Sequence, residues 1–338
     1  MASRVLSGIQ PTAEMHIGNY FGAVKNWVAL QDTHECIYAI VDLHAITMPY
    51  DPAKLRANTE RMVFDLLACG IDPDKALLFI QSLVPEHTEL CWILSCLASF
   101  GELRRMTQFK DKSDLLEGQD ATQFVSAALF TYPVLQAADI LAYRADYVPV
   151  GKDQEQHLEL SRELARRFNS QFGVDFFPEP AALFTETPKL MSLVDPTKKM
   201  SKSAGERHYI GLFEDEQSIR AKIKSAVTDS GDLPTGAEMS PGVVNLFEIL
   251  KACRKTEEAA ALLTDYYAGK RQYRELKEVV ANALVELTSG LRARRDEILK
   301  DAASVNVRVR EMTDKARGIA GETLGEVRGI IGLPDRTY

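Results

Sequence analysis

The sequence is short of the residues that mark secreted, metal-stabilised or nucleic-acid-coating proteins. Its five cysteines are scattered and form no Cys-x-x-Cys pair, so neither a disulfide framework nor a structural zinc site is expected. It has no excess of positive charge, because 40 basic against 48 acidic side chains give −8, which excludes a generic nucleic-acid-coating protein. It also lacks a bilayer-spanning apolar run and a signal peptide, so we expect a cytoplasmic protein that makes no membrane contact.

Apolar residues, in contrast, are plentiful. They make up 46% of the sequence, enough to bury a substantial core, and a length of 338 residues suggests two domains. In the first part of the chain, short β patterns alternate with helical patterns, which is typical of βαβ units and a parallel sheet. Four strands are expected at residues 4–7, 36–41, 76–80 and 146–151.

The β patterns end near residue 206, and the rest of the chain has helical spacing. Helical stretches are expected at 214–228, 243–290 and 291–302, with a loop at 229–236. We therefore predict an α/β fold, with a Rossmann-like parallel-sheet nucleotide-binding domain (1–205) and a smaller all-helical second domain (206–302). The last segment, 303–338, is expected to pack back on the sheet domain.

The loop after the first strand has the features of a phosphate site. It leads into a helix, whose free N–H groups and dipole favour anions. Gly18 permits close approach of a ligand, while His16 and Asn19 can donate hydrogen bonds. The alternative is a plain turn with a surface histidine.

A second loop, TKKMSKSAG (197–205), concentrates positive charge among small side chains. Lys199 and Lys202 are three residues apart, so both ammonium groups could reach one triphosphate. Met200 would anchor the loop in an apolar seam, while Ser201 and Ser203 supply hydroxyls. The alternative is a solvated basic loop.

These loops resemble the signature pair of class I aminoacyl-tRNA synthetases. KMSKS (199–203) occurs letter for letter, and HIGN (16–19) resembles the HIGH motif, with Asn19 as its last residue. Three further segments, SGIQPT (7–12), YPVLQAADIL (132–141) and VGKDQEQHLEL (150–160), resemble the tryptophanyl-tRNA synthetase family, in order over essentially the whole chain.

The resemblance implies an enzyme that activates L-tryptophan with ATP, accompanied by Mg²⁺, and transfers it to tRNA(Trp). It also implies a homodimer, and we expect no metal bound by protein ligands alone. The alternatives are a tyrosyl-tRNA synthetase and a synthetase-like regulatory protein that does not charge tRNA.

Asp139 is the residue expected to select tryptophan. Its carboxylate is predicted to be buried on an apolar helix, where it is costly without a donor. A lone acceptor in an apolar slot suits the single N–H of an indole ring. Tyr132 and Gln136 share its helical face. The alternative is an N-cap or a core salt bridge, and His44 is either a pocket wall or a structural histidine.

Other site residues follow from position and resemblance. Asp153 is placed to accept from ribose hydroxyls or to cap a helix, Gln154 is expected at the α-amino group, and the resemblance brings Lys112 to the phosphates. The expected catalytic set is His16, Asn19, Lys112, Lys199 and Lys202. The expected ATP-binding set is Gln10, Pro11, Thr12, Gly18, Asn19, Gly151, Lys152, Asp153, Leu190, Lys199, Met200, Ser201, Lys202 and Ser203. The expected tryptophan-binding set is Gln10, His44, Tyr132, Gln136, Asp139 and Gln154.

A basic patch near residue 292 is a candidate contact for tRNA. Arg292 and Arg295 share a helical face and Arg294 lies beside them. Guanidinium groups pair with phosphates and stack on unpaired bases. The alternative is a solvated helix in which Asp296 and Glu297 pair with the arginines.

Overall fold

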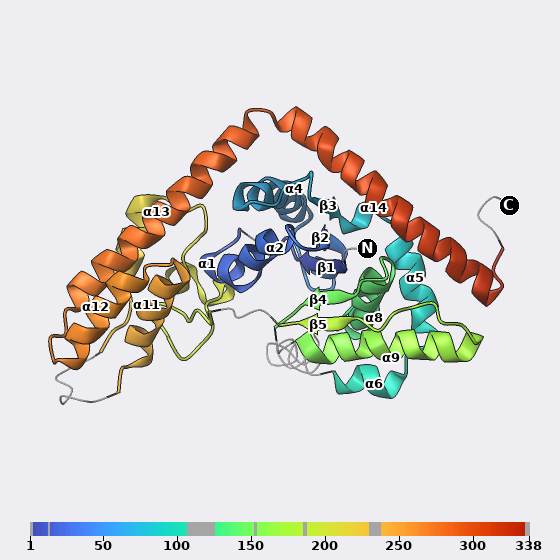
Figure 1. Cartoon of the computed structure of the whole chain (residues 1–338), viewed down its shortest axis with the longest axis horizontal. Helices are drawn as coiled ribbons and strands as arrows, with labels where there is room; N and C mark the ends of the chain where they lie inside the picture. Colours follow the sequence, from blue (N-terminus) through green and yellow to red (C-terminus); the bar gives the residue numbers. More distant parts are fainter. Residues whose placement is uncertain are drawn as a thin grey trace.

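The computed structural model of the chain contains a sheet of five parallel strands in the order β3-β2-β1-β4-β5 (Figure 1). The strands are Arg4–Ile9 (β1), Glu35–Ile40 (β2), Ala76–Ile80 (β3), Tyr147–Pro149 (β4) and Ala181–Leu183 (β5). The structure describes residues 3–12, 14–106, 126–151, 154–184, 188–229 and 238–334. The strand order reverses between β1 and β4, and such a reversal creates a ligand-binding crevice at the carboxyl ends of the strands.

Helices cover both faces of this sheet. They are Ile17–Asn19 (α1), Lys25–Leu30 (α2), Asp42–Ala45 (α3), Pro52–Cys69 (α4), Glu86–Ser95 (α5), Phe100–Arg105 (α6), Ala127–Leu141 (α8) and Glu155–Phe172 (α9). Shorter turns are Tyr20–Val24 (η1), Gln81–Leu83 (η2), Lys202–Ala204 (η4) and Glu206–His208 (η5). The chain thus enters α2 through a π-helical turn. α4 shows why a helix begins and ends where it does: Asp51 accepts from two N–H groups of its first turn, and Gly70 ends it with a φ of 113°.

The chain after residue 206 forms five helices among the residues described. They are Glu216–Ser225 (α10), Pro241–Ala252 (α11), Thr256–Tyr267 (α12), Tyr273–Leu299 (α13) and Ala302–Ile331 (α14). The single stretch expected at 243–290 is interrupted twice, where Arg254 and Gly269 take positive φ angles of 62° and 84°. α13 runs on past residue 290, where a division was expected.

The two long C-terminal helices connect the parts of the molecule. Figure 1 shows α13 and α14 meeting at a corner, with α13 along the helical side and α14 across the sheet side. α13 contacts α4, α10 and α11, while α14 packs against β3 and α5.

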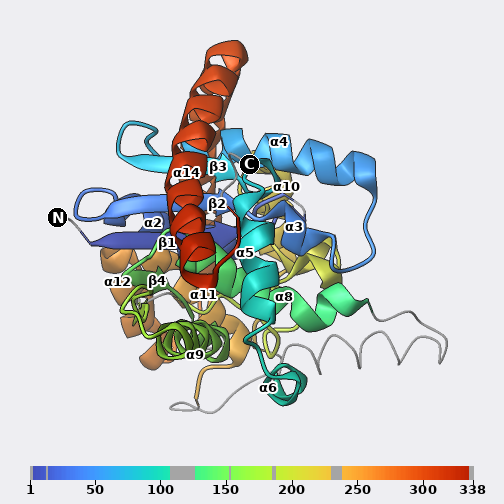
Figure 2. The ribbon, with the colours of Figure 1, turned by 90° about the vertical axis from the view of Figure 1, so that its right-hand side faces the viewer.

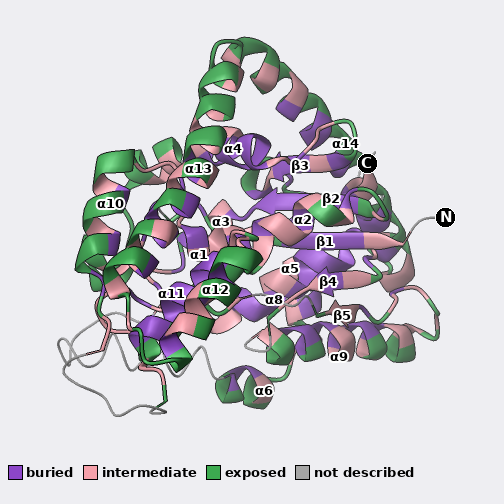
Figure 3. Cartoon of the chain, turned by 60° about the vertical axis from the view of Figure 1, so that its left-hand side comes forward, coloured by how far each residue is buried: buried purple, intermediate pink, exposed green. Residues whose placement is uncertain are grey.

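Two hydrophobic clusters lie on opposite faces of the sheet, and Figure 3 shows the buried strands between more exposed helices. Val5 belongs to one cluster and its neighbour Leu6 to the other, because successive side chains of a strand point to opposite faces. The cluster with Val5 continues into the helical region through Leu246 and Leu284. None of the described helices is both long enough and apolar enough to cross a membrane.

The β patterns locate four strands but not the fifth. β5 has only three residues, all half-buried, so it has no continuous apolar run. It lies at the sheet edge beside β4, where a strand needs fewer buried side chains.

Candidate active site

A cleft of about 250 Å³ lies beside the end of β1. The first βα loop lines one part of it and the loop 197–205 another. The lining residues are Ile9, Gln10, Thr12, Glu14, Met15, His16, Asn19, Met62, Ser201, Lys202 and Ser203. Two motifs that are far apart in the sequence therefore face one space.

Backbone contacts hold the two loops in place. The N–H of Ile17 donates to the carbonyl of Ile210 (3.0 Å), and the N–H of Leu212 donates to that of Met15 (2.8 Å). Met200 is buried at 3% exposure, which suits an anchor for its loop. A Cβ added at Gly18 would lie 2.8 Å from the His16 ring, so glycine at this position leaves room for the ring of His16.

His16 is held in an uncharged form with one ring nitrogen left open. Burial, followed by the charges of Lys202 and Lys199, lowers the pKa of His16 to about 4. Its Nδ1 is buried and has no hydrogen-bond partner among the described residues. Its backbone N–H donates to Asn19 Oδ1 (3.1 Å), so Asn19 also shapes the loop.

Lys202 brings positive charge into the cleft. Burial lowers its pKa to about 8, an effect that Glu14 opposes and Arg61 reinforces. The ammonium lies 5.6 Å from the centre of the Tyr209 ring and makes no ion pair with a described residue. Lys199 is exposed and is not among the residues that line the cleft.

Asp139 lies in a buried polar network. The expectation that its carboxylate is a lone acceptor in an apolar slot is therefore wrong. Its Oδ1 accepts from Gln81 Nε2 (2.7 Å) and His87 Nδ1 (2.6 Å), and its Oδ2 accepts from His44 Nε2 (2.8 Å). The reason is the cost of burying a carboxylate at 3% exposure, which requires donors. Burial alone would raise the pKa of Asp139, but hydrogen bonds from the two histidines lower it to about 2.

The network draws on several elements at the carboxyl edge of the sheet. His44 lies on α3 after β2, Gln81 directly follows β3, His87 is on α5, and Tyr143 follows α8. The hydroxyl of Tyr143 lies 2.8 Å from His87 Nε2. Sequence reasoning missed Gln81, His87 and Tyr143. The position of Gln81 after a buried strand could have identified it, whereas no sequence signal marks the other two.

Of the other expected tryptophan residues, Tyr132 lies beside this network. Tyr132 is buried on α8, with its hydroxyl 2.9 Å from His157 Nε2 and its ring 6.3 Å from that of His44. Gln136 and Gln154 are half-buried.

Some of the remaining expected residues are described by the structure and others are not. Leu190 is buried, and its carbonyl accepts from the N–H of Met200 (3.1 Å). Pro11 is buried and Gly151 exposed. Lys112, Lys152 and Asp153 lie outside the described residues.

The expected arginine patch for tRNA is not a free surface. Arg295 forms an ion pair with buried Asp65 of α4 (3.2 Å) and lies 4.2 Å from the Phe213 ring. Arg292 donates to the backbone carbonyl of Glu214. Both guanidinium groups thus connect α13 to neighbouring segments, and Arg294 remains exposed.

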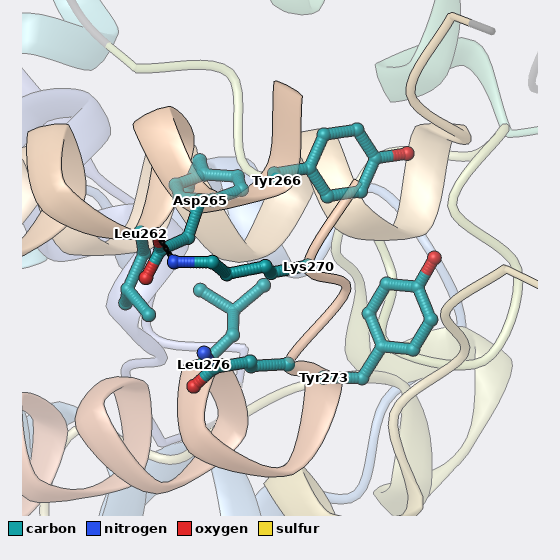
Figure 4. Close-up of a pocket in the computed structure, with 8 residues that line it drawn as sticks. Leu262, Asp265, Tyr266, Lys270, Tyr273 and Leu276 are labelled. Atoms are coloured by element: carbon teal, nitrogen blue, oxygen red, sulfur yellow. Dashed lines mark hydrogen bonds and ion pairs between the residues drawn. The ribbon is translucent and has the colours of Figure 1, made fainter. Parts of the chain in front are cut away.

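A second pocket lies in the helical region between α11, α12 and α13 (Figure 4). Its volume is about 10 Å³, room for no more than a water molecule, so it is no substrate site. Among the described residues, no group of three or more His, Cys, Asp or Glu side chains could hold a metal ion.

Known proteins with similar sequence and structure match nearly the whole chain. The family model for tRNA synthetases class I (W and Y) matches residues 1–289. A curated relative, tryptophan–tRNA ligase 2 of Streptomyces avermitilis, is 47% identical over 333 residues, which cover 98% of this chain and 97% of that protein.

Two solved structures are also similar. The tryptophanyl-tRNA synthetase of Mycoplasma pneumoniae gives a TM-score of 0.84 at 34% identity and covers 99% of both chains. The Campylobacter jejuni enzyme, solved with ADP and tryptophan, gives a TM-score of 0.82 at 34% identity and covers 98% of this chain and all of that one (100%).

Proposed function

The chain belongs to the class I tRNA synthetases for tryptophan and tyrosine, and we propose that its site joins L-tryptophan to tRNA(Trp) by way of a tryptophanyl-adenylate. This is the activity of a tryptophan–tRNA ligase, and the tyrosine alternative is not favoured, since the curated relatives are tryptophan ligases. The observation that carries the proposal is the shared cleft of the HIGN and KMSKS loops.

The first step is an in-line displacement at phosphorus. A carboxylate oxygen of tryptophan forms a bond to the α-phosphorus of ATP, and the bond from that phosphorus to the β-bridging oxygen breaks, releasing pyrophosphate. In the second step a hydroxyl of the terminal tRNA ribose attacks the acyl carbon, and AMP leaves. No protein nucleophile is required, so the site acts by positioning and by stabilising the charge on pyrophosphate.

The cleft residues match these needs. Lys202 supplies a positive charge that has no ion-pair partner among the described residues, and the open ring nitrogen of His16 can bond to a phosphate oxygen. Lys199 is an exposed residue of the same loop, and we assign it and Lys112 to the phosphates as well. Gln10 and Thr12 line the cleft where the nucleotide would lie.

We expect Mg²⁺ to bind together with ATP and not at a permanent site made of protein ligands. The carboxylate among the described lining residues, Glu14, is paired with Arg61 at 2.8 Å. Phosphate oxygens and water would therefore hold the ion, as is usual for Mg²⁺ at nucleotide sites.

The tryptophan side chain is assigned to the Asp139 network, with Tyr132, Gln136, Gln154 and His44 around it. A carboxylate has about four acceptor positions, and three are used by protein donors. The fourth is on Oδ2 and is the proposed partner of the indole N–H.

The partners are tRNA(Trp) and a second copy of the chain. Helices α10 to α13 are proposed to bind the anticodon arm, since they form the region outside the sheet domain. Because tRNA is charged where translation occurs, the reaction is assigned to the cytoplasm.

ATP–pyrophosphate exchange tests the proposal. We expect exchange with L-tryptophan and at least about a hundredfold less with L-tyrosine or L-phenylalanine, which lack the indole N–H. Charging of tRNA(Trp) tests the second step. Exchange without charging would favour a regulatory protein, and exchange driven by tyrosine would favour the tyrosine enzyme.

A further inference from the structure

The buried carboxylate of Asp139 accepts hydrogen bonds from three side chains. Two donors reach Oδ1 and one reaches Oδ2, from three different elements. A single donor would leave the carboxylate free to rotate. Three donors from separate elements define its plane, and the open acceptor position then points in one direction.

Gln81 can present only its amino group to Asp139. Its side chain is completely buried (0%) and its Oε1 accepts from the backbone N–H of Leu43 (3.1 Å). Since amide oxygen and nitrogen cannot exchange without losing this bond, Nε2 must face Asp139.

The ring of His87 is fixed in a similar way. Asp139 only accepts, so Nδ1 of His87 must carry the proton between them. Nε2 is then an acceptor for the Tyr143 hydroxyl at 2.8 Å. Burial raises the pKa of Tyr143, so its hydroxyl keeps the proton that it donates. Tyr143 thus supports the tautomer of His87 that Asp139 requires.

We propose that Gln81, His87 and Tyr143 are positioning residues for tryptophan selection, which hold the Asp139 carboxylate so that its remaining acceptor position meets the indole N–H. The inference rests on the proposed function. An acceptor fixed in this way discriminates strongly, because a substrate without the N–H leaves it unpaired.

The test compares tryptophan with benzothienylalanine, in which sulfur replaces the indole N–H. The readout is the ratio of kcat/KM for the two amino acids in ATP–pyrophosphate exchange. We expect Gln81→Met and His87→Phe to reduce the ratio about tenfold, and Tyr143→Phe to reduce it about threefold. The KM for ATP should stay within about twofold of wild type, because the ATP cleft is separate.

The matched control is Tyr38→Phe. Tyr38 is also fully buried, and its hydroxyl donates to the Trp27 carbonyl (2.8 Å) in the other core cluster. This variant loses the same hydroxyl as Tyr143→Phe but should keep the wild-type ratio. A network with a purely structural role would lower activity on both amino acids alike and leave every ratio unchanged.

Asp139→Asn tests the assignment of Asp139 to the indole N–H separately from the positioning role of its neighbours. If it reduces the ratio while Gln81→Met and Tyr143→Phe retain it, the positioning inference is overturned and the indole assignment stands. If Asp139→Asn itself retains the ratio, the indole assignment fails and the inference fails with it. The two milder variants decide the question even where His87→Phe does not fold.

Discussion

Lys202 and His16 show how burial adapts single side chains to a polyanionic substrate. Partial burial strips water from the Lys202 ammonium and lowers its pKa to about 8. The same surroundings keep His16 neutral, with a pKa of about 4. The cleft thus offers one strong cation and one neutral hydrogen-bonding ring instead of two competing charges.

Replacing Lys202 with alanine tests its role in the chemical step. We expect the rate of adenylate formation to fall about a hundredfold, since a charge aimed at the leaving group matters most in the transition state. The affinity for tryptophan should change little. Single-turnover kinetics separate the two quantities.

The control for this variant is Lys198→Ala. Lys198 lies in the same loop, but its side chain is 76% exposed and pairs with Asp195. A wild-type rate is expected for it. If Lys202→Ala only raised the KM for tryptophan, the loop would not have the role proposed here.

The lowered pKa of Lys202 predicts a pH dependence. Lysine is charged below its pKa, so kcat/KM for ATP should decline above about pH 8, as the ammonium of the free enzyme loses its proton. Lys202→Arg should be slower, because a planar guanidinium replaces a compact ammonium, but its profile should show no such decline. An identical decline in both proteins would assign it to another group.

Asp139 marks the limit of prediction at the level of residues. The burial of its side chain could be predicted from the apolar helix around it. Its donors could not, because His44, Gln81 and His87 lie 95, 58 and 52 residues away in the sequence. Only the packing of α3, η2 and α5 against α8 brings them together.

Arg295 and Asp65 form an ion pair that connects two elements, α13 and α4. Asp65 is 1% exposed, and burial raises its pKa while Arg295 opposes the rise. A second arginine, Arg61, lies 4.0 Å from the other carboxylate oxygen. This contact joins the helical region to the sheet domain close to the cleft, since Arg61 also pairs with Glu14.

Arg295→Met should destabilise the protein in a pH-dependent manner. The variant leaves a buried carboxylate with weaker compensation, a loss of about 3 kcal/mol in the free energy of unfolding at about pH 8. The folded-state pKa of Asp65 would rise further above its unfolded value, so the loss should shrink as the pH falls toward about 6 and the carboxyl takes up a proton.

Urea unfolding at the two pH values measures this effect. Arg308→Met is the matched control, because Arg308 forms an exposed pair with Asp74, whose side chain is 79% exposed, and such pairs contribute at most about 1 kcal/mol. Asp65→Asn combined with Arg295→Met should recover much of the lost stability. A loss independent of pH would mean that packing against Phe213, not charge, is the main contribution of Arg295.

Among the helices and strands, those marked by apolar runs or capping residues could be predicted better than boundaries that depend on a single residue. Strands β1 to β4 follow from apolar runs, and α4 lies between Asp51 and Gly70, residue types that begin and end helices. The breaks between α11, α12 and α13 do not, because they depend on positive φ at single residues such as Arg254.

At the scale of the whole molecule, three large apolar side chains remain exposed on η2, α5 and α6. Leu83, Trp92 and Phe100 are 53%, 74% and 68% exposed, and Phe100 contacts Phe130 of α8, with ring centres 5.0 Å apart. Figure 2 shows α5 and α6 on the same side of the molecule. Exposed apolar side chains mark an interaction site where they form a contiguous patch, and a self-complementary contact is the commonest kind of interface.

We therefore expect the proposed homodimer to use α5 and α6, and Trp92→Glu tests this expectation. A carboxylate at the centre of an apolar interface loses its water on association without gaining a partner, so dimerisation should weaken by about a hundredfold or more. Sedimentation over a range of protein concentrations measures the change. Tyr267→Glu is the control, because Tyr267 is a similarly exposed aromatic residue (65%) on α12 of the helical region, and it should remain dimeric. A dimeric Trp92→Glu protein would place the interface elsewhere, and a monomeric wild type would remove the homodimer from the proposed function.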